Sequence, residues 1–250
     1  MKWYLLDTGL NSGKFNMDFD IELAGKCSAE QAFLRLYRWN PYCISLGANQ
    51  NPEDINLEKA KQNGIDLVKR PTGGRAILHA EELTYSVVIP TSGLFSSTEI
   101  YRRVSLALVN GLKKYDPRLE QVELETAQPD FANILKAPSG MVCFGSTAKS
   151  EVKYKGLKLI GSAQRKMGHA ILQHGSILCG DYHLNLIDYL NLSEAEIALI
   201  KDEILHKTID LKSILDEDID YLRLSELLIK GFEAEFSLKF ENLDEISYLQ

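Results

Sequence analysis

The feature that most constrains the fold is a series of short apolar runs, each of strand length and each bounded by turn residues. The clearest pair, "IDLV" and "LTYSVVIP", is rich in β-branched residues and flanks the segment "KRPTGGR" at residues 69–75. β-Branched residues favour strands, and adjacent glycines favour a turn. The simplest interpretation is strand, tight glycine turn, strand, in a chain that builds its core around a β-sheet.

This glycine segment carries more than a turn requires. Gly73 and Gly74 lie between Arg70 and Arg75. Because glycine has no Cβ, a ligand can approach its backbone N–H group closely. Guanidinium groups beside such a turn favour an anionic or carbonyl-rich ligand. From these residues alone, a binding loop and an ordinary turn on a basic patch are equally good interpretations.

The rest of the chain alternates strand and helix patterns. Further strands are expected at residues 3–6, 33–39, 43–47, 152–154, 170–178 and 237–242. Helices are expected at residues 14–26, 56–63, 96–116 and, in pieces, from 184 to 236. Strands early, hairpins in the middle and helices late predict an α/β (α+β) fold with a mixed sheet flanked by helices.

Length and charge restrict the possible partners. A chain of 250 residues is long enough for one large core. Its net charge of −7 argues against nucleic acid as the main partner. No window approaches the roughly 18 apolar residues of a membrane helix, and the N-terminus has no signal-peptide pattern. We therefore expect a cytoplasmic protein that binds neither nucleic acid nor membrane.

Cysteine usage argues against a metal site and draws attention to one thiol. The four cysteines form no C-x-x-C pair and have no histidine at ligand spacing, so no zinc site is expected. Cys143 differs from Cys27, Cys43 and Cys179 because it lies in residues 126–150, which have neither helical nor strand periodicity. A long segment of this kind in a compact domain is usually functional or disordered.

The sequence after Cys143 is locally basic. Residues 149–166 place six cations against one acid, Glu151; the cations are Lys149, Lys153, Lys155, Lys158, Arg165 and Lys166. Nearby cations favour the nucleophilic thiolate form of a cysteine. The alternative, which the residues leave open, is a solvated hairpin face beside an incidental cysteine.

Other chemical motifs are absent or ambiguous. The chain has no P-loop, no G-x-G-x-x-G fingerprint and no G-x-S-x-G elbow. Glu81 and Glu82 are adjacent, so on a strand they would face opposite ways and would not form an acid–base pair. His79 and His174 each lie in an apolar strand-like run, where a packed residue and a site residue are equally good interpretations.

Several longer motifs resemble the lipoate–protein ligase and octanoyltransferase family. They are "WYLLDTG" with "NMD", "ISLGANQ", "RPTGGRAILHAEELTYSV", "CFGSTAKSEVKYKGLKLIGSAQRK" and "ILQHGSI". The resemblance covers nearly the whole chain. It implies the catalytic fold shared with class II biotin–protein ligases, a mixed and mostly antiparallel β-sheet flanked by helices. It also implies a catalytic domain over residues 1–185, with residues 186–250 as a helical extension packed on it.

Within this family the chain looks most like the cysteine-dependent octanoyltransferases of the LipM type. Cys143 and Phe144 match their "CF" motif at ungapped spacing to Lys158 and "GSAQ", and "GGR" at residues 73–75 also fits that branch. Two departures are that Ala80 stands where an aspartate is common, and that residues 145–150 lack the usual proline and tyrosine.

The resemblance implies an acyl transfer in two steps. Cys143 would take an octanoyl group from acyl carrier protein, and Lys158 would polarise the carbonyl group and help proton transfer. The acceptor would be a lysine on a lipoyl domain, of glycine cleavage H protein or of a 2-oxoacid dehydrogenase E2. No cofactor would be needed. The substrate-binding residues would be Arg70, Gly73, Gly74, Arg75, His79, Gly161, Ser162, Ala163, His174 and Gly175.

Finer roles follow from the same resemblance. Arg70 and Arg75 would meet the phosphopantetheine phosphate or the acidic carrier surface. Val68, Ile77 and Val87 would form an apolar wall around the acyl chain.

Three alternatives remain on the same scaffold. An ATP-dependent lipoate–protein ligase would use ATP and magnesium to form an acyl-adenylate, with Cys143 incidental. An amidotransferase would move lipoyl groups between proteins through a cysteine. A binding module without catalytic activity would only hold the acyl carrier.

Overall fold

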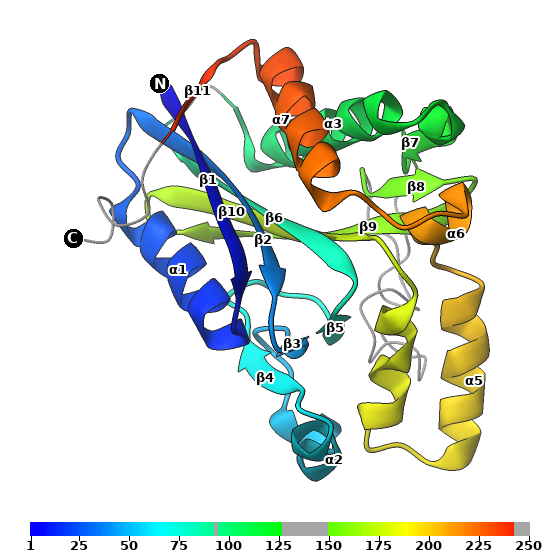
Figure 1. Ribbon diagram of the computed structural model, residues 1–250. Helices are drawn as coiled ribbons and strands as arrows, with labels where there is room; N and C mark the ends of the chain where they lie inside the picture. Colours follow the sequence, from blue (N-terminus) through cyan, green and yellow to red (C-terminus); the bar gives the residue numbers. More distant parts are fainter. Residues whose placement is uncertain (93–94, 127–149, 243–250) are drawn as a thin grey trace.

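The computed structural model describes residues 1–92, 95–126 and 150–242 (Figure 1). Cys143 and the rest of residues 127–149 lie outside the described residues. Two β-sheets, several α-helices and short 3₁₀-helices make up the described part. None of these helices is long and apolar enough to cross a membrane.

The main sheet has eight strands in the order β11-β1-β2-β6-β10-β9-β8-β7. Its strands are β1 (Lys2–Asn11), β2 (Gln31–Trp39), β6 (Glu82–Pro90), β7 (Val122–Leu124), β8 (Val152–Tyr154), β9 (Leu157–Met167), β10 (Ala170–Leu178) and β11 (Phe240–Asn242). Strands β11, β1 and β2 run parallel, and every other neighbouring pair is antiparallel. The predicted mixed, mostly antiparallel sheet is therefore confirmed.

A second sheet shows that the glycine segment is not a hairpin turn. In this sheet β3 (Cys43–Leu46) lies between β4 (Asp66–Lys69) and β5 (Ile77–His79). Strand β4 is parallel to β3 and β5 is antiparallel, so residues 70–76 cross the end of β3 to join its two edges. The interpretation as strand, tight turn, strand was wrong, because periodicity shows where strands lie but not which strands pair. We call residues 70–76 the glycine loop.

Helices cover both faces of the main sheet (Figure 1). Helix α1 (Gly13–Lys26) packs on one face through a cluster that includes Phe19, Leu23 and Leu172. Helices α3 (Ser97–Tyr115) and α7 (Tyr221–Phe236) pack on the other face, where the largest core cluster lies. The remaining helical elements are η1 (Pro52–Asp54), α2 (Leu57–Gln62), η2 (Pro117–Gln121), η5 (Tyr182–Tyr189), α5 (Glu194–Leu205) and α6 (Leu211–Leu215).

Local sequence signals set the bounds of the predicted elements. The Ser96 side chain accepts a hydrogen bond from the backbone N–H of Glu99, which caps the first turn of α3 as the sequence predicts. In the β8–β9 hairpin, Lys155 and Gly156 both have positive φ angles, of 48° and 83°. Two such residues form the turn whose twist suits a two-residue hairpin, so the predicted hairpin is confirmed.

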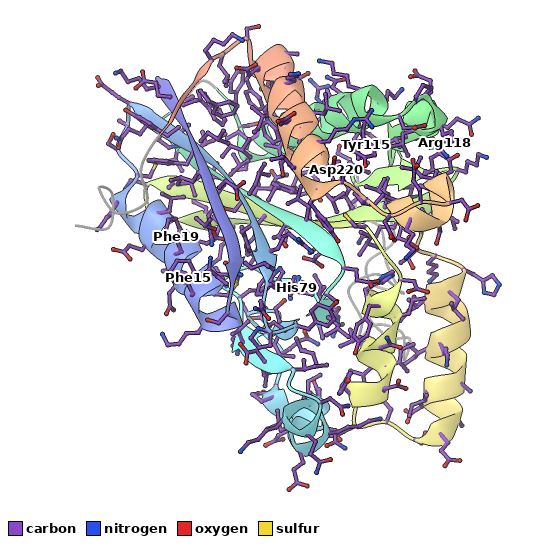
Figure 2. All side chains as sticks on the ribbon, viewed as in Figure 1. Phe15, Phe19, His79, Tyr115, Arg118 and Asp220 are labelled. Carbon is purple, nitrogen blue, oxygen red and sulfur yellow. The ribbon has the colours of Figure 1, made fainter. Side chains whose placement is uncertain are left out.

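The C-terminal segment joins the rest of the chain closely. Leu224, Leu228 and Phe232 of α7 belong to the largest core cluster, and β11 adds a parallel strand to β1. Where α7 begins, the backbone N–H of Asp220 donates to the hydroxyl of Tyr115 at the end of α3 (Figure 2). The division at residues 185 and 186 stays a prediction.

Candidate active site

A pocket opens where the small sheet and the glycine loop meet the main sheet, and His79 marks this place in Figure 2. The empty space in it, counted together with the solvent at its open side, is about 340 Å³. Its lining consists of Met17, Tyr37, Trp39, Arg70, Ile77, His79, Thr84, Gly161, Ser162, Ala163, His174, Gly175 and Ser176. We call it the central pocket.

The central pocket brings together most of the predicted substrate-binding residues. Seven of them line it: Arg70, His79, Gly161, Ser162, Ala163, His174 and Gly175. Gly73 and Gly74 are exposed in the glycine loop, Arg75 is half-buried, and none of the three is among the lining residues. The assignment of substrate contacts to all ten residues stays a prediction.

Sequence reasoning missed part of the wall. Met17 of α1 and Tyr37 and Trp39 of β2 line the pocket, and the odd-numbered positions of β2 from Arg35 onward share this face. Alternation along β2 puts Tyr37 and Trp39 on one face, but it does not show that this face borders a pocket. Of the predicted apolar wall, Ile77 lines the pocket, and Val68 packs in a neighbouring cluster with Met17 and Trp39.

Val87 is a correction to the predicted wall. It belongs to the largest core cluster, on the face of β6 that packs toward α3. Its neighbours Ser86 and Val88 point to the opposite face, because successive side chains of a strand alternate. Without the strand's orientation, the sequence could not show which alternate residues face the pocket.

His79 is held by a carboxylate on one side and a hydroxyl on the other. Its Nδ1 atom lies 2.8 Å from Oε1 of Glu82, and its Nε2 atom lies 2.7 Å from Oγ of Ser45. The ring also stacks on Trp39 at 4.0 Å between centroids. A carboxylate can only accept, so Nδ1 of His79 carries a proton that it donates to Glu82.

Glu82 is the centre of a buried network. Its Oε1 atom also accepts from Thr84 at 2.6 Å and from Ser176 at 2.7 Å. Burial by itself raises the pKa of this carboxyl, but His79 and the two hydroxyl donors outweigh it and hold the pKa below its ordinary value. Its Oε2 atom is buried and has no hydrogen-bond partner among the described residues.

Arg70 supports the glycine loop from inside. Its guanidinium group donates to the backbone oxygens of Ser45, Gly73 and Arg75 at 2.7–3.3 Å, and to the Ser45 hydroxyl. The residue is only 4% exposed. The prediction that Arg70 meets a phosphate or a carrier surface is therefore wrong, because its donors are directed at the loop backbone.

His174 links a second buried carboxylate, that of Asp20, to the glycine loop by hydrogen bonds. Its Nδ1 atom lies 3.2 Å from Oδ2 of Asp20, and its Nε2 atom lies 2.7 Å from Oγ of Thr72. Burial lowers the pKa of His174 despite the Asp20 carboxylate, so the ring is neutral near pH 7. The neutral ring donates to Asp20 and accepts from Thr72.

Asp20 is in turn fixed by Arg35. Both side chains are fully buried, and the guanidinium NH1 atom lies 2.8 Å from Oδ1 of Asp20. Burial raises the pKa of Asp20, but Arg35 and the hydrogen bond with His174 together hold it below its ordinary value. The guanidinium group also lies over Phe19 and Tyr37, at 4.4 and 3.9 Å from the ring centroids.

Two glycines permit close approach of backbone segments around the pocket. A Cβ atom on Gly175 would lie 2.5 Å from the Gly161 oxygen and 2.8 Å from Oγ of Ser162. A Cβ atom on Gly47 would collide with the backbone of Gly74. Any side chain at these positions would push β9 or the glycine loop away.

Lys158 lies on the strand that forms one pocket wall, but it is not among the lining residues. It is 1% exposed, and its Nζ atom lies 2.8 Å from Oε1 of Glu151. Lys153 forms an ion pair with Glu125. The hairpin is therefore less basic than its sequence indicates, because the carboxylate of Glu125, which is distant in sequence, lies beside it in the fold.

The three thiols in the described residues are poor nucleophiles. Cys27, Cys43 and Cys179 are all at most 3% exposed. Burial raises the pKa of Cys27 to about 11, and burial also raises the pKa of Cys43 and Cys179. No group of three or more potential metal ligands occurs within residues 1–92, 95–126 and 150–242.

The architecture first defines a class of fold. A lipoate–protein ligase of Thermoplasma acidophilum with bound lipoic acid matches the chain with a TM-score of 0.74 at 20% identity, covering 99% of this chain and 93% of that one. Lipoate–protein ligase A bound with ATP gives a TM-score of 0.76 at 20% identity, with 99% and 92% covered. The fold is thus the one found in lipoate–protein ligases.

Sequence comparison then gives the family. The chain belongs to the lipoyl protein ligase A/B catalytic domain family, whose model matches residues 12–233. A protein of Staphylococcus aureus named Octanoyltransferase LipM is 33% identical over 249 residues, covering 97% of this chain and 90% of that protein. Its namesake in Kyrpidia tusciae is 35% identical, with 96% and 89% covered. The resemblance expected from the motifs is confirmed.

Proposed function

We propose that the protein is an octanoyltransferase that moves an octanoyl group from acyl carrier protein to a lysine of a lipoyl domain, by way of a cysteine thioester. Relatives named Octanoyltransferase LipM match almost the whole chain, which supports an acyl transfer of this kind. The proposed reaction takes place in the cytoplasm and uses neither ATP nor a metal ion.

The surface of the central pocket is the observation that carries the proposal. Many polar side chains border the pocket, yet the surface they leave facing it is mostly apolar. The reason is that His79, Glu82, Thr84, Ser176 and Arg70 direct their polar atoms at one another or at the backbone. A pocket of this kind suits an uncharged alkyl chain.

The proposed chemistry has two steps. The thiolate of Cys143 attacks the thioester carbon of the donor, a new carbon–sulfur bond forms, and the electron pair of the old one leaves on the pantetheine sulfur. The uncharged amine of the acceptor lysine then attacks the enzyme thioester. The amide bond forms, the Cys143 thiolate is released, and the amine loses one proton to water. Lys158 stabilises the oxyanion formed in each step.

Cys143 lies outside the described residues, and its role rests on the family motif and on elimination. The other three thiols are buried and have raised pKa values, so none of them is a good candidate for the acyl carrier. The proposal therefore assigns the thioester to Cys143.

The proposed partners follow from the relatives. A solved structure of the same fold is described as a bipartite lipoate–protein ligase of Thermoplasma acidophilum and its E2 lipoyl domain. A lipoyl domain, of an E2 protein or of glycine cleavage H protein, is accordingly the proposed acceptor. We assign the contact with the donor's phosphate to Arg75, which is half-buried, since Arg70 is engaged inside the loop.

The test is an intact-mass measurement without ATP. Purified protein mixed with octanoyl-acyl carrier protein should gain one octanoyl group, and adding a lipoyl domain should move that group to the domain. Cys143→Ala should abolish the gain, because no other thiol in the described residues is an accessible thiolate.

Cys27→Ala is the matched control and should gain the octanoyl group as the parent does. Transfer that needs free octanoate or lipoate with ATP, and that survives Cys143→Ala, would instead identify a ligase. Donor binding with no acylation under either condition would identify a binding module.

A further inference from the structure

Lys158 is the one buried lysine within residues 1–92, 95–126 and 150–242. Its ammonium group lies 2.8 Å from the carboxylate of Glu151, which is 4% exposed. Opposite charges at hydrogen-bond distance stabilise the charged form of each partner. The two residues therefore form a buried ion pair beside the strand that lines the central pocket.

The backbone holds both members of the pair in place. The backbone N–H of Lys158 donates to the oxygen of Lys207, and the N–H of Ile209 donates to the oxygen of Lys158. On the other side, the N–H of Glu125 donates to the oxygen of Glu151. Each residue is thus fixed by a segment remote in sequence, so the geometry of the pair is a property of the fold.

Stability alone does not explain a pair of this kind. Removing two charges from water is unfavourable, and a well-packed apolar pair is often as stable. Buried ionisable groups with a specific charge partner beside a pocket are therefore candidates for a role in chemistry.

The carboxylate of Glu151 also acts on Tyr85, a core residue that contacts the pocket wall. Tyr85 has a pKa raised to about 12, mainly by burial, and the negative charge of Glu151 adds to this rise. The Tyr85 hydroxyl lies 2.7 Å from Oγ of Ser162, which lines the central pocket. The charge of Glu151 thus acts on a core residue whose hydroxyl contacts a residue that lines the pocket.

We propose that Glu151 is a positioning residue, which orients the Lys158 ammonium group and keeps it positively charged for the acyl-transfer reaction. This inference rests on the proposed function. It also refines that function, because a lysine with a permanent carboxylate partner acts as a fixed cation at the carbonyl oxygen. A fixed cation lowers the energy of the oxyanion without giving up its proton.

The chain offers a matched control in a second ion pair. Glu125 pairs with Lys153 on the neighbouring strand β8, and both side chains are 15% exposed. Neither residue lines the central pocket. Lys153 lies directly opposite Lys158 on the neighbouring strand, so Glu125→Gln removes the same kind of charge close to Lys158 and leaves the Glu151 carboxylate in place.

The test measures octanoyl transfer to a lipoyl domain in the full-length chain. Glu151→Gln should lower kcat by about tenfold to a hundredfold, the cost of misplacing a catalytic group, while KM for the octanoyl donor stays within about twofold. Glu151→Asp, which keeps the charge but shortens the reach, should recover part of this loss. Glu125→Gln should keep the parent kcat within about twofold.

A double variant separates positioning from a structural role. If Glu151 acts through Lys158, adding Glu151→Gln to Lys158→Met should cause no further loss of rate. The comparison also covers the case in which Glu151→Gln alone fails to fold, since the double variant leaves no unpaired buried charge.

The outcomes are distinguishable. An active parent whose Glu151→Gln variant keeps its kcat within twofold overturns the positioning role, and so does a further loss of rate in the double variant. A parent that transfers no octanoyl group at all contradicts the proposed function, and the positioning role falls with it.

Discussion

At the scale of single residues, the candidate site is organised by buried carboxylates that never line it. Glu82 holds His79, and Asp20 holds His174. Each histidine is then linked by hydrogen bonds to the glycine loop. His79 is linked through Ser45 and Arg70, and His174 is linked through Thr72. The result is a pocket with polar borders and a mostly apolar surface.

These buried groups predict how stability depends on pH. The pKa of His174 in the folded chain lies below 6.5. As the pH falls, the unfolded chain therefore binds a proton at this histidine at a higher pH than the folded chain does. The free energy of unfolding should fall as the pH drops below about 6.5. The slope for one histidine is at most about 1.4 kcal/mol per pH unit. The pKa values of Asp20 and Glu82 are also lowered, so stability should fall further below about pH 4.5.

Urea unfolding between pH 8 and pH 4 checks this expectation. His174→Gln should reduce the slope between pH 5 and 6.5 without abolishing it, because one of two buried histidines with a lowered pKa is gone and His183 remains. His169→Gln, which changes an exposed histidine in the β9–β10 turn, should leave the slope unchanged. Equal slopes in the parent and in His174→Gln would contradict the assignment.

At the scale of elements, α3 and α7 pack closely against each other. A Cβ atom on Gly111 would lie 2.7 Å from the Cα atom of Leu228, and one on Gly231 would collide with the backbone oxygen of Ala107. The two helices thus meet backbone to backbone. Leu228 and Phe232 pack in the same core cluster.

Replacing one of these glycines should separate the helices. Gly231→Ala should lower the free energy of unfolding by about 1–3 kcal/mol, because the added methyl group overpacks the contact. Gly25→Ala in α1, where a Cβ atom would meet nothing within 4 Å, should leave stability unchanged or raise it by up to about 1 kcal/mol. Equal effects of the two changes on urea unfolding would show that α3 and α7 leave room for a methyl group at Gly231, against the close contact described.

At the scale of the whole molecule, the C-terminal helices complete the core begun by the first half of the chain. The main sheet runs from β11, near the C-terminus, to β7, near the middle of the sequence. Leu211, Leu215 and Leu224 are at most 1% exposed, in the same core cluster as α3. Residues 1–185 by themselves would leave that face of α3 uncovered.

A chain that ends at residue 185 should therefore fail to fold alone. Burial of apolar surface is the main favourable term in folding, and this fragment lacks the side chains that cover α3. We expect no cooperative urea transition and no near-UV circular dichroism from the fragment, against a single transition for the full chain. A cooperative transition in the fragment would instead support an independent catalytic domain within residues 1–185.

The predictable part of the site came from motifs, and the unpredictable part from strand pairing. Ser162 and His174 lie in motifs that the sequence singles out, and both line the central pocket. Trp39 and Thr84 also line it, but no local pattern distinguishes them from core residues. Arg70 was identified as a site residue, but its predicted contact with a phosphate was wrong. The backbone oxygens that it contacts belong to β3 and to the glycine loop, whose path depends on the order of the strands.

The sequence by itself determined the family, the positions of most helices and strands, and the turn between β8 and β9. These depend on motifs, caps and periodicity, which are local properties of the chain. Only the tertiary structure decided that β3 separates β4 from β5, that Glu82 faces His79, and that Glu151 is buried against Lys158. Such contacts depend on which strands become neighbours, and that choice is made by the packing of the whole core.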